Sequence, residues 1–212
     1  KLDVSGGLLA KSRGGYSWGN AGTIEILAGQ DPKMTGIIGG SLNLGAELLG
    51  YSGARGGTLR IKSEQVIVSD AKTSNSGNIL TLPSVFFSQG GFSSFELTGI
   101  GAKTPASGQN LPAVLIDSSA SIKPIPRSLA YIPYPGSKGS RVQPIIKPVG
   151  LRNPVDISLK AIGAIDNLSK LPLVRGDLVM ENGASISTDP LSSISMTGET
   201  VAIAGKIEVP AG

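Results

Sequence analysis

The sequence predicts an all-β chain built as a solenoid, and its spacing of short apolar runs carries that prediction. Runs of alternating apolar and polar residues recur along the chain, each bounded by glycine. Similar runs begin at Gly22, Gly40 and Gly57, about 17 to 18 residues apart, and repetition at roughly 20 residues is typical of a solenoid. No segment holds a sustained 3.6-residue period, so the sequence indicates no helix-rich fold.

Each predicted strand is about four to six residues long and places two apolar side chains on one face. The pairs are Ile24 and Ile26, Leu42 and Leu44, Leu59 and Ile61, Val66 and Val68, Leu80 and Leu82, Phe95 and Leu97, Ile157 and Leu159, Ile194 and Met196, Val201 and Ile203, and Ile207 and Val209. The strands within residues 184–209 have links too short for Greek-key crossovers. Of a sandwich, a closed barrel and a solenoid, a solenoid with about three strands per turn therefore fits best.

The middle of the chain interrupts this pattern with proline. Residues 100–154 hold nine of the 14 prolines, at positions 105, 112, 124, 126, 133, 135, 144, 148 and 154. Proline donates no hydrogen bond to a sheet ladder, so only Ala113–Asp117 and Ala120–Lys123 are expected as strands here. Residues 124–148 are expected to be turns and extended polyproline-like backbone, forming either a projecting loop or arm or a spacer. We divide the chain into coils at 1–99, a proline-rich insertion at 100–154 and further coils at 155–212.

Composition excludes several function classes. The chain has no cysteine and no histidine, which removes disulfides, thiol nucleophiles, and the commonest general base and metal ligand. The net charge is +4, and the lysines and arginines are scattered along the sequence without a basic stripe, so nucleic-acid binding is not expected. No run of 18 apolar residues occurs, so no membrane insertion of this segment is expected.

Several phrases resemble those of filamentous haemagglutinin-like large exoproteins. They lie at residues 17–29, 56–68, 86–99, 152–159 and 174–186, and include Gly56-Gly-Thr-Leu-Arg-Ile-Lys62 and Phe86-Phe-Ser-Gln-Gly-Gly-Phe92. The resemblance covers most of the chain apart from the proline-rich stretch. It implies a right-handed parallel β-helix (solenoid), with the proline-rich loop or arm interrupting the coils.

The resemblance also implies a place and a role. Members of this family are exported by an outer-membrane two-partner secretion transporter and form rods that are secreted or displayed on the Gram-negative cell surface. We therefore expect an internal shaft segment of an adhesin, which attaches to a host or neighbouring-cell surface receptor or glycan without catalysis. Neither a cofactor nor a metal is expected. A purely mechanical spacer without binding of its own is the alternative within this class.

Two groups of residues are candidate contacts. Arg175, Gly176 and Asp177 form an Arg-Gly-Asp sequence, which an integrin could read through its bound metal, or in which Gly176 simply turns a corner. Arg127, Tyr131, Tyr134 and Arg141 lie in the proline-rich stretch and would make contacts from an arm. Tyr16 and Trp18 could stack on sugar rings, although local packing is the simpler expectation. Phe86, Phe87, Phe92 and Phe95 are expected in the core.

A polysaccharide lyase or hydrolase with a β-helical fold is the rival interpretation. Such an enzyme needs acidic residues clustered on one face, often with calcium. The aspartates are isolated in sequence, with no Asp-x-Asp pair, and the calcium-binding Gly-Gly-x-Gly-x-Asp repeat is absent. Because stacked coils could still bring acids together, only their positions in space can test this interpretation.

Overall fold

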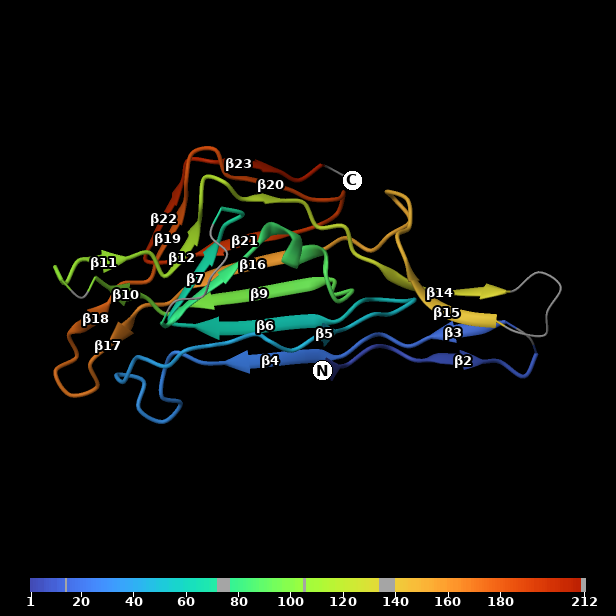
Figure 1. The fold of residues 1–212 in the computed structure, drawn as a ribbon, viewed down its shortest axis with the longest axis horizontal. Helices are drawn as coiled ribbons and strands as arrows, with labels where there is room; N and C mark the ends of the chain where they lie inside the picture. Colours follow the sequence, from blue (N-terminus) through green and yellow to red (C-terminus); the bar gives the residue numbers. More distant parts are fainter. Residues whose placement is uncertain (14, 72–76, 105, 134–139, 211–212) are drawn as a thin grey trace.

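The computed structural model describes residues 1–13, 15–71, 77–104, 106–133 and 140–210 (Figure 1). Within these ranges the chain is built from short β-strands and one 3-10 turn, η1 (Ser84–Ser88), with no α-helix. The all-β prediction is therefore confirmed. None of the described elements is a helix with the length and apolarity that a membrane crossing requires.

Three parallel sheets form the body of the molecule. The first contains, in spatial order, β4 (Thr23–Leu27), β6 (Thr58–Ser63), β9 (Ser94–Gly99), β16 (Asp156–Ala161) and β21 (Ile194–Thr197). The second contains β8 (Ile79–Leu82), β7 (Gln65–Val68), β12 (Val114–Ile116), β19 (Asp177–Met180) and β22 (Thr200–Ile203). The third contains β13 (Ser121–Ile122), β20 (Ser185–Ser187) and β23 (Lys206–Glu208). In Figure 1 the first sheet rises from β4 at the bottom to β21 near the top.

The chain visits these sheets in a repeating order. It passes from the first sheet to the second and then to the third through β9, β12 and β13, again through β16, β19 and β20, and again through β21, β22 and β23. Each new strand lies parallel to its equivalent and in register, as in Leu97 opposite Leu159 and Leu159 opposite Met196. The same register joins Ile116 to Met180 and Met180 to Ile203. Like side chains therefore stack on like side chains.

The core lies between the sheets and is made of the apolar residues that alternate along the strands. Leu59, Leu97, Leu159 and Leu178 are all buried. Phe87 and Phe95 are buried and meet edge to face with ring centroids 5.2 Å apart, and Phe92 packs on Phe95 at 5.9 Å. The predicted core position of the phenylalanines is thus confirmed for these three, while Phe86 is only partly buried.

One predicted strand is absent, and two others lie at sheet edges. Residues 40–45 form no strand, although Leu42 and Leu44 still pack against the core. Strand β8 follows β7 along the chain and pairs with it in parallel, at the edge of the second sheet. Val201 and Ile203 are 40% and 50% exposed, because β22 is the opposite edge strand of this sheet.

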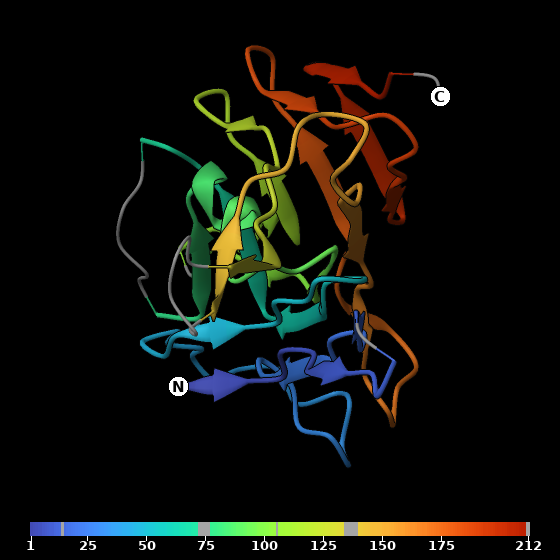
Figure 2. The ribbon, with the colours of Figure 1, turned by 90° about the vertical axis from the view of Figure 1, so that its right-hand side faces the viewer.

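Antiparallel hairpins leave the sheets at their corners. Strands β2 (Leu8–Ala10) and β3 (Tyr16–Trp18) form one hairpin, and β14 (Ser128–Pro133) and β15 (Ser140–Ile145) form another. Figures 1 and 2 show both extending to the same end of the molecule. Smaller hairpins, β10 (Ala102–Lys103) with β11 (Asn110–Leu111) and β17 (Ala164–Ile165) with β18 (Pro172–Val174), lie at the other end. The short strands β1 (Leu2–Asp3) and β5 (Leu48–Leu49) pair in parallel.

The proline-rich stretch therefore needs two corrections. Residues 100–154 are not a single insertion, because β12 and β13 belong to the second and third parallel sheets. Residues 124–148 are not polyproline-like throughout, since β14 and β15 pair residue by residue, from Ser128 opposite Ile145 to Pro133 opposite Ser140. Pro144 is tolerated because a two-stranded ladder has a free side on which no donor is needed. We call residues 123–155 the arm.

Candidate functional site

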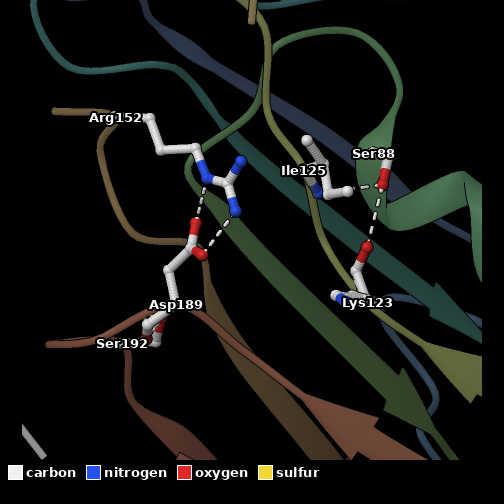
Figure 3. Close-up of polar contacts among 6 residues, drawn as sticks. All are labelled: Ser88, Lys123, Ile125, Arg152, Asp189 and Ser192. Atoms are coloured by element: carbon white, nitrogen blue, oxygen red, sulfur yellow. Dashed lines mark hydrogen bonds and ion pairs between the residues drawn. The ribbon is translucent and has the colours of Figure 1, made fainter. Parts of the chain in front are cut away.

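The arm is fixed to the body where the chain leaves and where it returns (Figure 3). On the way out, the hydroxyl of Ser88 in η1 donates to the carbonyl oxygen of Lys123 at 3.3 Å and accepts from the backbone N–H of Ile125 at 3.0 Å. On the way back, the guanidinium of Arg152 forms a two-pronged ion pair with Asp189, beyond β20. These contacts hold the arm's base at a defined position.

The ion pair of Arg152 and Asp189 is shielded from water. Their side chains are only 9% and 12% exposed, and the Nη2–Oδ1 distance is 2.5 Å. The hydrogen bond that Arg152 donates to Asp189 raises the pKa of Arg152 above its usual range, so the guanidinium stays charged. The Ser192 hydroxyl donates to the backbone oxygen of Asp189 at 2.7 Å and steadies the turn that carries the carboxylate.

Ser52 connects the arm to the hairpin of β2 and β3. Its side chain is buried, and its hydroxyl donates to the carbonyl oxygen of Gly19 just after β3, at 2.7 Å. Its own carbonyl oxygen accepts from the backbone N–H of Leu129 in β14, at 2.9 Å. Beyond this bridge, the rings of Tyr16 and Tyr131 meet with their centroids 4.1 Å apart. The two hairpins therefore form one continuous surface.

Trp18 packs inward beneath this surface. A Cβ atom on Gly53 would lie 2.1 Å from Cδ2 of the indole, so the ring rests directly on the glycine backbone. This is the local packing that the sequence favoured for Trp18 over sugar stacking. Tyr16 is 42% exposed but has the Tyr131 ring as its neighbour.

Charge is distributed unevenly between these hairpins and the rest of the chain. Residues 4–24 and 118–155 hold eight of the 19 lysines and arginines and none of the 15 aspartates and glutamates. The remaining residues hold 11 basic and 15 acidic side chains, which is a net charge of −4 against +8 for the two segments. We define the basic hairpin surface by Lys11, Arg13, Tyr16, Arg127 and Tyr131.

A cavity of about 760 Å³ lies at the base of the arm. Its walls are mainly apolar, and charged Glu47 and Arg127 also line it. The apolar lining includes Leu48, Leu82, Phe86, Phe92, Ile125 and Ile146. Arg127 therefore borders both the cavity and the basic hairpin surface.

The Arg-Gly-Asp sequence lies at the start of β19 and not on an extended loop. Arg175 Nε is 3.1 Å from Asp177 Oδ2, and this hydrogen bond raises the pKa of Arg175. Gly176 is buried, and a Cβ there would lie 2.5 Å from the backbone nitrogen of Gly163. The geometry favours the corner interpretation, because the carboxylate that an integrin would read is already engaged by Arg175.

The carboxylates are dispersed. All 15 acidic residues fall within the described ranges, and no three of them come together as a metal-binding group there. Asp70 instead has a structural role at a corner of the fold. Its carboxylate accepts hydrogen bonds from the N–H and hydroxyl of Ser84 at 2.7 and 2.6 Å, and from the N–H of Ser121 at 3.2 Å. The arrangement that a calcium-dependent polysaccharide enzyme requires is not found among the described residues.

The structure thus brings some predicted contacts together and separates others. Arg127, Tyr131 and Arg141 all belong to the arm, although Arg141 lies opposite Ile132 and so faces away from Tyr131. Arg175 follows β18 and Asp177 begins β19, and Figure 1 shows these two strands toward the other end of the molecule. Tyr134 lies outside the described residues.

Sequence reasoning missed Lys11 and Arg13, which lie in the turn of the β2–β3 hairpin, and considered Tyr16 only for stacking on sugar rings, whereas the fold places Tyr16 against Tyr131 of the arm. Their charges look scattered along the chain because the two segments are far apart in sequence. The signal that could have identified them is the lack of any acidic residue across both 4–24 and 118–155.

Comparison with family models, with curated proteins and with solved structures finds no match for this chain.

Proposed function

We propose that this chain is a non-catalytic, adhesive segment of a rod-like bacterial surface protein, built as a right-handed parallel β-helix of the filamentous haemagglutinin type. The observation that carries the proposal is the threefold repetition of strands in register, from β9, β12 and β13 to β21, β22 and β23. Such stacking suits a rod, because each layer presents the same edge to the next layer.

The hairpins suit contact with another surface. In a stacked body the strands are occupied with one another, so segments that leave the sheets are the parts free to bind. The arm leaves between β13 and β16 and is fixed at Ser88, Ser52 and Asp189. A display element held in this way loses little conformational entropy when it binds. Many such weak contacts along a rod would add up to firm attachment.

Replacement of the β14–β15 hairpin tests this proposal. Ser128 and Ile145 are register partners, so a two-residue Asn-Gly turn can join them in place of residues 129–144. We expect this variant to keep the circular dichroism spectrum of the parent chain and to lose most of its adhesion to cells in a bead-binding assay. In the matched control, a shorter turn replaces residues 166–171 between β17 and β18, in the hairpin at the other end of the molecule. This control should adhere like the parent. Equal adhesion of the arm variant and the parent would refute the role of the arm.

A further inference from the structure

The cavity at the base of the arm lies where the third parallel sheet ends. Within the described residues, β13 has one strand neighbour, β20, and its other side faces η1, where the Ser84 hydroxyl accepts from the N–H of Ser121 at 2.9 Å. The cavity of about 760 Å³ opens beside η1, and residues 44–49 line it from another side. The arm closes its outer side, where the Ser88 hydroxyl holds Ile125 next to η1 (Figure 3).

The walls of the cavity are apolar and extend from the core to the surface. Leu80, Phe92 and Phe95 line it and are no more than 2% exposed. Val85 and Ile146 also line it and are 57% and 54% exposed, so the cavity opens to solvent beside them. Binding pockets for small molecules have volumes of about 300–1,000 Å³, mainly apolar walls and a few polar groups that orient the ligand. The cavity matches that description.

Two charged side chains lie among these apolar walls. Arg127 directly precedes β14 and Glu47 directly precedes β5, and both are exposed. Among the described residues, neither forms an ion pair with the other or with a third residue. The surroundings of Arg127 favour an anion, because residues 118–155 hold six basic side chains and no acidic one. A guanidinium group binds a carboxylate through two parallel hydrogen bonds.

We infer that this cavity binds a long-chain monocarboxylate, that is, an unbranched apolar chain that ends in a carboxylate, as in a fatty acid. The chain lies against Leu82, Phe86 and Phe92, and the carboxylate pairs with Arg127 at the surface. Removal of each methylene group from water stabilises the complex, and the charge pair determines which end of the ligand stays outside. This ligand goes beyond the proposed adhesive function and does not depend on it.

A cationic amphiphile and a lipid bilayer fit the cavity less well. A cationic head group could pair with Glu47, but it would lie among the basic side chains of the arm. The surface of a bilayer cannot cover Leu80 or Phe95, because both are fully buried behind the rim of the cavity. A single apolar chain that enters the cavity can reach them.

Isothermal titration calorimetry of the 212-residue chain with hexanoate, octanoate, decanoate and dodecanoate tests the inference, at concentrations below those at which these acids form micelles. We expect the affinity to rise about threefold to fourfold for each added methylene group. The heat capacity should fall on binding, because apolar surface is buried. Acetate and decyltrimethylammonium should bind at least about tenfold more weakly than decanoate.

Variants distinguish the charged end of the site from its apolar part. Arg127→Gln should weaken decanoate binding about tenfold, and Glu47→Gln should strengthen it, because the negative charge near the carboxylate is removed. Ile146→Trp fills the mouth of the cavity from an exposed position and should weaken binding at least about tenfold. Val149→Trp adds the same side chain at an exposed residue that does not line the cavity, and Lys160→Gln removes one exposed charge elsewhere. Both controls should change the affinity less than about twofold.

Circular dichroism reports whether each variant is folded. An affinity that does not depend on chain length would overturn the inference, as would equal losses in Arg127→Gln and Lys160→Gln or in the two tryptophan variants. Binding to vesicles of anionic phospholipid without binding to decanoate would overturn it too. The variant with the β14–β15 hairpin replaced keeps Arg127 and Ile146 and should bind decanoate like the parent, even if it no longer adheres to cells. The adhesion assay and the titration can therefore fail independently.

Discussion

Tyr16 and Tyr131 lie with their ring centroids 4.1 Å apart and their planes tilted by 33°, although they come from hairpins far apart in the sequence. The hydrogen bond between their hydroxyls raises the pKa of Tyr16 above its usual 10.0, so the neutral phenol is favoured in the folded chain. The contact links the β2–β3 hairpin to the arm at a point beyond the Ser52 bridge. It therefore determines whether the basic residues of the two hairpins act as one surface.

A double-mutant cycle measures this link. We expect Tyr16→Ala and Tyr131→Ala to be coupled by about 0.5–1.5 kcal/mol in the free energy of unfolding, as is usual for packed aromatic pairs. Urea denaturation of the parent, the two single variants and the double variant gives the coupling. Tyr51, whose ring lies against Gly91, provides the control: Tyr16→Ala and Tyr51→Ala should be additive. Additivity between Tyr16 and Tyr131 would show that the ring contact does not hold the hairpins together.

The ion pair of Arg152 and Asp189 is expected to dominate the stability of the arm's base. Arg152→Ala should destabilise the chain by about 3–5 kcal/mol, because it leaves Asp189 buried without a cation. The exposed pair of Arg60 and Glu96 is the matched control, and Arg60→Ala should cost far less stability than Arg152→Ala. Urea denaturation checks both variants. Similar losses in the two variants would mean that water reaches the Arg152 pair as readily as the surface pair.

The parallel strands were predictable because their signal is local. In β6, β9 and β16, two apolar residues alternate with polar ones, and the structure buries Leu59 and Ile61, Phe95 and Leu97, and Ile157 and Leu159 as expected. The same rule failed at Leu42 and Leu44, which pack against the core from irregular backbone. Alternation reports which side chains are buried, but it does not say whether a partner strand is present.

The candidate surface was less predictable because it depends on contacts distant in sequence. The sequence identified Arg127, Tyr131 and Arg141 from the proline-rich stretch, but nothing near Tyr16 indicates that Tyr131 will lie beside it. Proline density indicated an irregular arm, whereas cross-strand pairing makes β14 and β15 a regular hairpin. A proline in a strand has no backbone N–H to donate to a neighbouring strand, so it is tolerated only where no such donor is needed. Each strand of the β14–β15 hairpin has only one neighbour, which leaves a free side for the prolines.

Trp18 offers a direct optical test of the packing beneath the hairpins. Gly53→Ala would place a methyl group 2.1 Å from Cδ2 of the indole, so the ring must move outward. Since Trp18 is the only tryptophan of the chain, its emission should shift to longer wavelength and become easier to quench with acrylamide. We expect a loss of about 1–3 kcal/mol in stability from the overpacking. Gly45→Ala is the control, because nothing lies within 4 Å of its Cβ position, and an identical fluorescence change there would contradict the predicted contact.

The stability of the corner at Asp70 should depend on pH. Burial acts to raise the pKa of Asp70, but hydrogen bonds from Ser84 and Ser121 outweigh it, so the pKa lies below the usual 3.8. The unfolded chain then binds more protons than the folded chain in acid, which means that Asp70 stabilises the fold above about pH 3.8. That stabilisation is lost as the pH falls through the lower, folded-state pKa. Asp70→Asn should therefore lower the urea midpoint at pH 7. In acid, the urea midpoint of this variant should fall less steeply with pH than that of the parent.

Glu64 should show the opposite dependence and so serves as the control for Asp70. Burial raises the pKa of Glu64 above its usual 4.5, and the hydrogen bond from Asn78 only partly opposes this effect. The Glu64 carboxyl holds its proton more tightly in the folded chain than in the unfolded chain. Glu64 therefore reduces the stability of the fold as the pH rises above 4.5. Glu64→Gln keeps an oxygen that can accept from Asn78 and removes the buried charge, so it should raise the urea midpoint at pH 7. If the urea midpoints of Asp70→Asn and Glu64→Gln changed with pH in the same way, the opposite pKa shifts expected for the two carboxyl groups would be wrong.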